Sequence, residues 1–334
     1  MSEAAIQPTD LSPADFRATT AAIEQQVGRV IVGQHEVVRL VLMCIIAGGH
    51  ALLEGVPGLG KTMLIRTLAD VLDLRFARIQ FTPDLMPADI TGTDVLDESE
   101  EGRKVRVFQP GPVFANLVLA DEINRATPKT QSALLEAMQE KSVTVASRTY
   151  QLDLPFFVLA TQNPLEMEGT YPLPEAQLDR FMFKIDVGFP STEELVEIVA
   201  RTTGASLASA GVAADGATII QMGDLARRVP APTQVTEYAA RLVVATHPGS
   251  GVTNGGMVDR YVRYGSSPRG AQALILGAKV NALLDGRYNA SIDDVKAVAH
   301  AALRHRLILN FEAQAEGIST DAVIASLLDS VPEA

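Results

Sequence analysis

The sequence contains a single cysteine, no tryptophan and few aromatic residues, which make up 5% of its 334 residues. One cysteine cannot form a disulfide within the chain. Cys44 lies in an apolar run, VVRLVLMCIIAGG, where a buried, inert thiol is more typical than a reactive one. Aliphatic side chains must therefore supply most of the core, and the apolar share of the whole chain is 47%.

Positive charge is also scarce, because 28 lysines and arginines face 40 aspartates and glutamates, for a formal net charge of −12. Such a chain lacks the basic footprint that sequence-independent binding of nucleic acid requires. The apolar run around Cys44 is far shorter than the roughly 20 residues that cross a bilayer. The N-terminal stretch MSEAAIQPTDLSPADF lacks the basic and then apolar pattern of a signal peptide. We therefore expect a cytoplasmic protein with no membrane span, and nucleic acid is a disfavoured ligand.

Residues 55–62, GVPGLGKT, satisfy the phosphate-loop pattern G-x-x-x-x-G-K-(S/T). Glycines let the backbone turn its N–H groups inward around phosphates. Lys61 would reach the β- and γ-phosphates, and the Thr62 hydroxyl would bind Mg²⁺. The preceding HALLEG is typical of a short buried strand and the following MLIRTLADVL of a helix, whose N-terminus would face the phosphates. This context favours a nucleotide-binding loop over an ordinary glycine turn.

A second apolar run, residues 117–120, ends in the two carboxylates Asp121 and Glu122. Four apolar residues followed by Asp are the usual partner of a phosphate loop. Asp121 would hold Mg²⁺ through its water shell. Glu122 could polarise a water for attack on the γ-phosphate. Taken alone, such a pair could equally be a helix cap or a loop charge, but the preceding phosphate loop favours a catalytic role.

Two further polar residues, Asn163 and Arg180, are candidates for the same chemistry. Asn163 ends the apolar run PFFVLATQNP (155–164), where an amide can hydrogen-bond both a γ-phosphate and the attacking water. The alternative for Asn163 is a turn before Pro164. Arg180 lies near the end of a short predicted helix, PEAQLDRF. It could form a salt bridge with Asp179, or it could act at a subunit edge as a finger on a neighbour's γ-phosphate.

The pattern along the chain predicts a boundary near residue 190. We expect a flexible N-terminus over 1–12, a core of strands and helices over 13–190, and helices without strands over 191–334. Two hairpins would interrupt the core, over 93–114 and 142–154. Beyond the boundary, residues 204–217 are typical of a flexible loop, and FEAQAEGISTDAVIASLLDSV of one final helix.

These landmarks together make the chain, from about residue 12 to 330, resemble the AAA+ ATPases and, within them, the MoxR family. The motifs that carry the resemblance are GVPGLGKT (55–62), LVLADEINRA (117–126), ATQNP (160–164), LPEAQLDRF (173–181) and SSPRG (266–270). The resemblance implies an α/β P-loop NTPase core, in which helices flank a parallel sheet, followed by an all-α lid domain. The hairpins at 93–114 and 142–154 would be the helix-2 insert and the pre-sensor-1 hairpin.

The resemblance also implies a role for each site residue. Lys61 and Thr62 look like the Walker A pair and Asp121 and Glu122 like the Walker B pair. Asn163 is similar to sensor 1, Arg180 to the arginine finger and Arg269 to sensor 2. The expected catalytic residues are Lys61, Glu122, Asn163, Arg180 and Arg269. The expected Mg²⁺ ligands are Thr62 and Asp121. The expected ATP contacts, including two residues that resemble the adenine-binding box, are Val32, Gly33, Gly55, Val56, Pro57, Gly58, Leu59, Gly60, Lys61, Thr62 and Met63.

A member of this family is expected to hydrolyse ATP as a homo-oligomer, usually a hexameric ring whose pore is lined by the two hairpins. Such proteins resemble chaperones that assist the maturation or assembly of other proteins. The resemblance therefore implies a client protein, and a partner that carries a von Willebrand factor A domain. ATP and Mg²⁺ are the expected cofactors.

Three alternatives remain open at this point. A nucleic-acid-dependent motor shares both hairpins but predicts basic tips, whereas Arg148 is nearly alone on one hairpin and acids outnumber bases on the other. A small-molecule kinase would need a pocket for a phosphate acceptor. A nucleotide switch that does not hydrolyse ATP is disfavoured by Glu122, which is the group that such a switch would lack.

Overall fold

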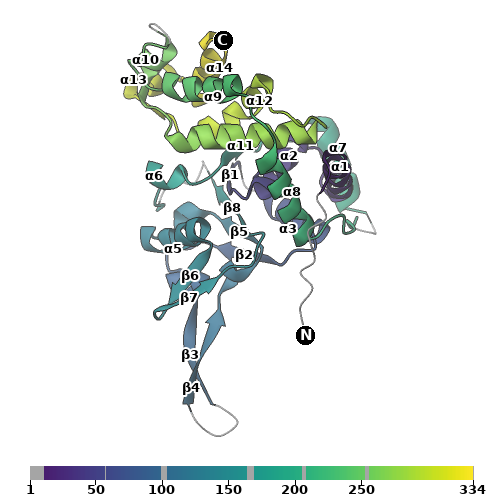
Figure 1. Ribbon diagram of the computed structural model, residues 1–334. Helices are drawn as coiled ribbons and strands as arrows, with labels where there is room; N and C mark the ends of the chain where they lie inside the picture. The colour runs from purple at the N-terminus through teal and green to yellow at the C-terminus, as the bar shows by residue number, and fades with distance from the viewer. Residues whose placement is uncertain are drawn as a thin grey trace, which may run out of the picture.

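The computed structural model describes residues 11–56, 58–98, 104–163, 169–204, 208–252 and 256–333 (Figure 1). The elements up to the predicted boundary are α1 (Pro13–Val30), α2 (His35–Ala47), β1 (Ala51–Glu54), α3 (Lys61–Val71), β2 (Phe76–Gln80), α4 (Pro87–Thr91), β3 (Gly92–Glu98), β4 (Lys104–Pro110), β5 (Leu117–Asp121), α5 (Pro128–Glu140), β6 (Ser142–Val145), β7 (Arg148–Gln151), β8 (Phe157–Gln162), α6 (Glu175–Leu178) and β9 (Phe183–Asp186). The elements after it are α7 (Thr192–Thr202), α8 (Gly216–Arg228), α9 (Thr233–Ala245), α10 (Met257–Tyr261), β10 (Val262–Tyr264), α11 (Pro268–Leu284), α12 (Ile292–Leu303), β11 (Ile308–Leu309), α13 (Phe311–Glu316) and α14 (Thr320–Ser330).

The central sheet has five strands in the order β2-β5-β8-β1-β9, and every neighbouring pair is parallel. Parallel strands covered on both faces are built from continuous apolar runs. Leu117 to Ala120 of β5 and Phe157 to Ala160 of β8 fit this rule, because all are buried. The predicted α/β core with a parallel sheet is therefore confirmed.

The side chains of the three central strands, β5, β8 and β1, divide between two hydrophobic cores, one on each face of the sheet. In β5, Leu117 and Leu119 belong to a core shared with α1, α2, α3 and several C-terminal helices. Val118 and Ala120 belong to a smaller core shared with α4 and α5. This division follows from the alternation of side chains along a strand. The sheet is consequently fixed from both sides, and its polar strand ends meet at one edge.

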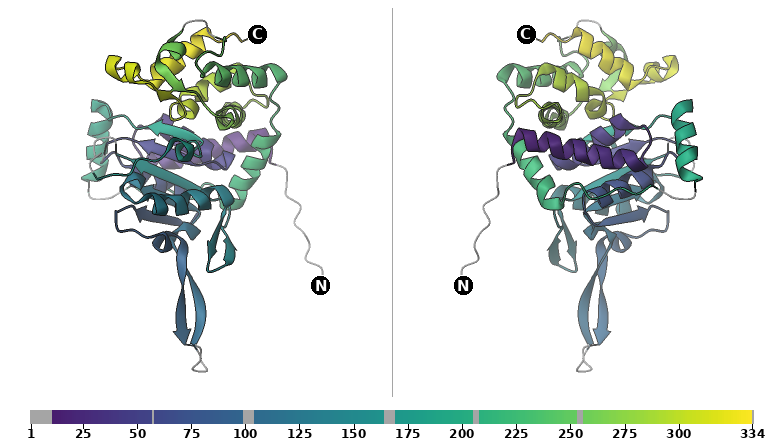
Figure 2. Two further views of the ribbon diagram at one scale, coloured as in Figure 1. Left: turned by 90° about the vertical axis from the view of Figure 1, so that its left-hand side faces the viewer. Right: turned by 90° about the vertical axis from the view of Figure 1, so that its right-hand side faces the viewer.

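Both predicted hairpins are present, and β3–β4 projects far from the body of the molecule (Figures 1 and 2). The residues between the two strands, 99–103, lie outside the described residues. At the bases of the hairpins, the Phe108 and Tyr150 rings stack with their centroids 4.0 Å apart. Phe114 packs edge-on against Phe108, with 5.5 Å between centroids. The two hairpins are therefore in direct contact through aromatic rings.

The C-terminal region is helical as expected, but the prediction that it contains no strands was wrong. Strands β10 and β11 form a short antiparallel pair. The predicted final helix is divided into α13 and α14, because Gly317 ends α13 in the left-handed conformation and Ser319 caps the N-terminus of α14. Helix α8 was not foreseen, and it packs against α2. In the described part of the chain, no helix is both long and apolar enough to cross a membrane.

Candidate functional site

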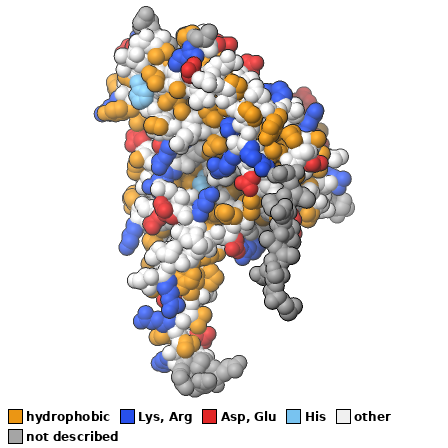
Figure 3. Space-filling model, viewed as in Figure 1, with side chains coloured by type: hydrophobic (Ala, Val, Ile, Leu, Met, Phe, Trp, Pro, Cys, Tyr) orange, Lys and Arg blue, Asp and Glu red, His pale blue; other side chains and the backbone are white. Residues whose placement is uncertain are grey.

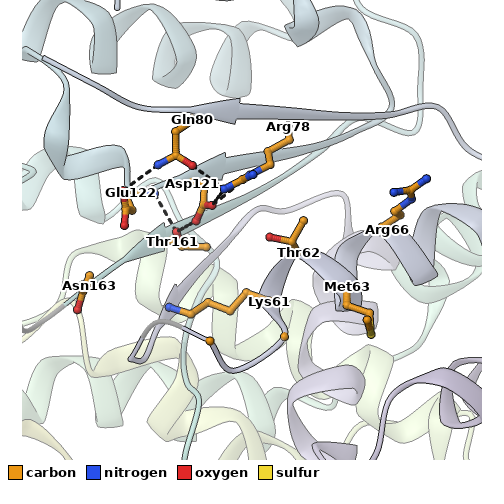
Figure 4. Close-up of a pocket in the computed structure, with 12 residues that line it drawn as sticks. Lys61, Thr62, Met63, Arg66, Arg78, Gln80, Asp121, Glu122, Thr161 and Asn163 are labelled. Atoms are coloured by element: carbon orange, nitrogen blue, oxygen red, sulfur yellow. Dashed lines mark hydrogen bonds and ion pairs between the residues drawn. The ribbon is translucent and has the colours of Figure 1, made fainter. Parts of the chain in front are cut away.

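A cavity of about 630 Å³ opens where the strands β5 and β8 end beside the loop before α3 (Figure 4). Because parallel strands point the same way, their polar C-terminal residues gather at this edge of the sheet. The cavity is lined by Gly58, Gly60, Lys61, Thr62, Met63, Arg66, Arg78, Gln80, Asp121, Glu122, Thr161 and Asn163. The structure thus brings together the predicted phosphate loop, both predicted carboxylates and Asn163.

The loop before α3 depends on glycine at two positions. Gly58 and Gly60 have φ angles of 87° and 76°, in the left-handed region that side chains disfavour. Helix α3 begins directly afterwards at Lys61, so its first N–H groups and its dipole point into the cavity. Pro57, which was predicted to contact ATP, lies outside the described residues. The local geometry is that of a cradle for anionic groups.

Lys61 extends into the cavity, where its ammonium group donates a hydrogen bond of 2.5 Å to the Gly55 carbonyl oxygen (Figure 4). Burial lowers the pKa of Lys61 below that of an ordinary lysine, and the charges of Asp121 and Glu122 oppose this shift. The negative charge of a phosphate chain bound in the cavity would stabilise the protonated form of Lys61, which burial disfavours.

Thr161 of β8 connects the two carboxylates. Its hydroxyl donates to Asp121 Oδ1 at 2.7 Å and accepts from the Glu122 backbone N–H at 2.9 Å. Glu122 itself has a φ of 56°, which turns its side chain away from the line of β5. Thr161 was missed at the sequence level, because only the pairing of β5 with β8 places it beside Asp121.

Arg78 and Gln80 of β2 also contact the carboxylates, and the sequence did not identify them. Gln80 pairs in register with Asp121, and residues two apart on a strand face the same side. Arg78 donates to Asp121 Oδ2 at 2.6 Å and to Gln80 Oε1 at 2.6 Å. Gln80 Nε2 donates to Glu122 Oε2 at 2.8 Å, and Arg125 donates to the same oxygen at 2.9 Å. Alternation in RFARIQF could have placed Arg78 and Gln80 on one face, but not beside β5.

The turn with Val32 and Gly33 is tied to the phosphate loop, although neither residue lines the cavity. Gln34 Nε2 donates to the Leu59 carbonyl oxygen at 3.1 Å. Gly33 has a φ of 61°, and a Cβ added there would lie 1.9 Å from Glu194 Oε1. The backbone conformation favours glycine at this position, and any side chain there would also force the Glu194 side chain to move.

Arg180 and Arg269 do not line the large cavity. They meet at a smaller one of about 110 Å³, together with His50, Met138 and Gln139. Arg180 Nη1 donates to the Leu135 carbonyl oxygen at 3.0 Å. The structure therefore brings the two predicted arginines to each other but not to the phosphate loop of their own chain.

The large cavity has the groups that a magnesium nucleotide requires. Mg²⁺ prefers hard oxygen ligands, and the Thr62 hydroxyl and the Asp121 carboxylate both line the cavity. Glycine N–H groups, an ammonium group and a helix N-terminus suit a phosphate chain. Glu122 is the remaining carboxylate; it accepts hydrogen bonds from Gln80 and Arg125 here, and it could orient a water once one of them is released.

Comparisons with known proteins agree with this arrangement. A family model described as "ATPase family associated with various cellular activities (AAA)" matches residues 50–183, and an "AAA lid domain" model matches residues 256–327. Chaperone MoxR1 of Mycobacterium tuberculosis is 44% identical over 92% of this chain and 80% of its own length. Protein MoxR of Methylorubrum extorquens is 32% identical over 98% of each chain. A crystal structure from Cytophaga hutchinsonii, described provisionally as an ATPase, has a TM-score of 0.90 and 42% identity, and covers 96% of each chain.

Proposed function

The chain belongs to the MoxR family of AAA+ ATPases, and from this premise we propose that it hydrolyses ATP as a ring-forming remodeller of partner proteins. One observation carries the proposal. The phosphate loop and both carboxylates share one cavity, while the two arginines expected to complete the site lie at another.

Within one subunit, the residues of the large cavity would bind the triphosphate and position the attacking water. The loop N–H groups and Lys61 hold the phosphates, and Asn163 orients the γ-phosphate and the water. Mg²⁺, bound through Thr62 and Asp121, would neutralise negative charge on the phosphates. Glu122 orients the water once its carboxylate is released from Gln80 and Arg125, to which it is hydrogen-bonded in this structure.

Between subunits, Arg180 and Arg269 would complete the neighbour's site. Both line a cavity that contains no residue of the phosphate loop. An arginine supplied by a neighbour stabilises the charge that develops on the transferred phosphoryl group, and it is worth roughly 10³-fold or more in rate. A ring, which we expect to be hexameric, gives every subunit such a neighbour.

The projecting hairpin would engage the client. Its arms expose Leu96, Val105 and Val107, and Figure 3 shows hydrophobic and basic side chains along it. Exposed aliphatic groups suit a polypeptide better than a nucleic-acid backbone, which binds chiefly to clustered positive charge. The chaperone named among the relatives supports a protein client, and we retain a von Willebrand factor A domain protein as the expected partner.

Steady-state ATP hydrolysis measured against protein concentration tests the proposal. Specific activity is expected to rise with concentration as rings form, and Glu122→Gln is expected to abolish it. Arg180→Ala and Lys61→Ala are each expected to be inactive alone and to regain part of the activity when mixed. Arg17→Ala, which changes an exposed arginine on α1, is the control.

Activity that is independent of concentration, with Arg180→Ala near normal, would refute a shared site. Stimulation of hydrolysis by DNA or RNA would favour the nucleic-acid motor.

A further inference from the structure

The structure assigns Asp179 as a positioning residue. Its carboxylate ties the segment that carries Arg180 to Ser267 and Arg306 of the C-terminal region, and these contacts set the positions of both Arg180 and Arg269. The inference rests on the proposed function, because it concerns the arginines that would act on a neighbouring subunit's ATP. Asp179 directly precedes Arg180, and it follows α6.

The Asp179 carboxylate is bound by side chains from the N-terminus of α11 and from the segment that follows α12. The Ser267 hydroxyl donates its proton to the carboxylate, and its Oγ lies 2.9 Å from Oδ1 and 2.8 Å from Oδ2. Arg306 Nε donates to Oδ1 at 2.9 Å. Arg269 Nη1 lies 3.5 Å from Oδ2. Three C-terminal side chains therefore converge on the residue next to Arg180.

The backbone on both sides of Arg180 is held by the same region. Arg306 donates to the carbonyl oxygens of Asp179 at 3.1 Å, Phe181 at 2.7 Å and Met182 at 3.1 Å. His305 Nε2 also lies 3.0 Å from the Phe181 carbonyl oxygen. The backbone that carries Arg180 is thus held by Arg306 and His305 after α12, in addition to the bond of 2.8 Å from the Met182 N–H to the His50 carbonyl oxygen.

Arg306 depends on Asp179 for its charge balance. Its side chain is only 2% exposed, and Asp179 is the carboxylate that pairs with it. Burial lowers the pKa of Arg306, and the Asp179 charge opposes that shift. A buried guanidinium without its carboxylate would be left uncompensated, which is costly. We therefore expect the ion pair between Asp179 and Arg306 to stay intact during the ATPase cycle.

Ser267 connects the Asp179 carboxylate to the backbone of Arg269. Its hydroxyl caps α11 by accepting from the Arg269 backbone N–H at 3.1 Å, while it donates to Asp179. The backbone of Arg269 is thereby fixed relative to Asp179. The Arg269 side chain, in contrast, is 46% exposed and makes the longest of the carboxylate's contacts. It can exchange Asp179 for a neighbour's phosphate while Ser267 and Arg306 stay bound.

The substitution Asp179→Asn tests the assignment, because it removes the charge and keeps the size. We expect the affinity for a fluorescent ADP analogue to stay within about twofold of wild type, since the chain's own phosphate loop is untouched. The kcat for ATP is expected to fall about 10- to 100-fold, the loss that a small misplacement of a catalytic group causes. The control is Asp186→Asn, which breaks another contact to the C-terminal region, the 2.8 Å pair with Arg304, away from Arg180.

Mixing experiments separate positioning from a general structural role. Asp179→Asn is expected to regain activity when mixed with Lys61→Ala, and to regain none when mixed with Arg180→Ala, because both defects then lie on the same side of the shared site. Ser267→Ala, which removes one hydrogen bond to Asp179, should lower kcat to a smaller extent and serves if Asp179→Asn does not fold. If Arg180→Ala is inactive while Asp179→Asn and Ser267→Ala keep full kcat, the positioning role of Asp179 is overturned, and the shared site still stands. If Arg180→Ala is itself near normal, the shared site fails, and the role of Asp179 fails with it.

Discussion

The amide of Gln80 holds the carboxylate of Glu122 through a hydrogen bond of 2.8 Å between adjacent strands. The same carboxylate oxygen accepts from Arg125. Glu122 in this structure is thus engaged by two donors and directed toward β2. Its role as the water-orienting group would require at least one of these contacts to be released.

Replacement of Gln80 by alanine should raise the basal rate of ATP hydrolysis. It removes one of the two donors that hold Glu122, and a hydrogen bond of this type is worth about 1 kcal/mol, or roughly fivefold. The measurement is kcat of the isolated protein at saturating ATP. Gln314→Ala, which changes an exposed amide on α13, is the control. A kcat below that of wild type would mean that Gln80 positions Glu122 rather than restrains it.

Replacement of Thr161 by valine should lower kcat about tenfold or more. Valine keeps the shape but leaves the Glu122 N–H without its acceptor and removes the donor to Asp121 Oδ1, and each such loss costs about 1–3 kcal/mol. The Mg²⁺ concentration needed for half-maximal activity should rise as well, because Asp121 loses one of the two groups that orient it and keeps only Arg78.

The matched control for this variant is Thr144→Val. Thr144 also makes a hydroxyl hydrogen bond between strands, to Thr149 at 3.1 Å, but on an exposed hairpin. Equal activity of Thr161→Val and Thr144→Val would show that Thr161 only supports the sheet.

Much of the core and site could be predicted because each signal is local. The phosphate loop, the strand before it and the Asp121–Glu122 pair all lie within short continuous stretches, and the structure places them in one cavity. Gln80 and Thr161 could not be found in this way. Their role depends on which strands are neighbours, and strand order is set by packing across the whole sheet.

In the C-terminal region, one helix and two strands were not predicted, for different reasons. Ile219, Met222 and Leu225 of α8 are buried at helical spacing, so that this helix had a readable signal beside a polar stretch. Strands β10 and β11 had none, since three and two residues are too few to show an alternating pattern. The meeting of Arg180 with Arg269 joins positions far apart in the chain, and only tertiary packing brings it about.

Replacement of Gly33 by alanine should weaken nucleotide binding and lower stability. The new Cβ would collide with the Glu194 carboxylate, and the positive φ angle would be strained. Because Gln34 binds the Leu59 carbonyl oxygen, movement of this turn should disturb the phosphate loop. We expect a several-fold higher Kd for ADP in equilibrium titration. The double variant Gly33→Ala with Glu194→Ala should recover part of the affinity, and no recovery would contradict the steric explanation.

Acidification should destabilise the protein through His50, a buried side chain beside the arginine pair. The Val158 backbone N–H donates to His50 Nδ1 at 3.0 Å, and Nε2 lies 3.1 Å from the Met138 carbonyl oxygen. Nδ1 is therefore an acceptor, and protonation there would break its bond. Burial lowers the pKa of His50 to about 4. The unfolded chain, in which histidine has a pKa of about 6.5, binds the proton first as the pH falls.

The free energy of unfolding should consequently decrease between about pH 6.5 and about pH 4, by about 3 kcal/mol from this group. Urea denaturation at several pH values in this window measures it. His50→Asn, whose side-chain oxygen can still accept from Val158, should be less stable near neutral pH but lose less stability on acidification.

His305 is buried as well, and its pKa is lowered in the same direction, so that only the difference between variant and wild type reports His50. The exposed His35→Asn should follow the wild type. Parallel curves for wild type and His50→Asn would mean that His50 is already protonated in the folded protein or that other groups dominate its acid response.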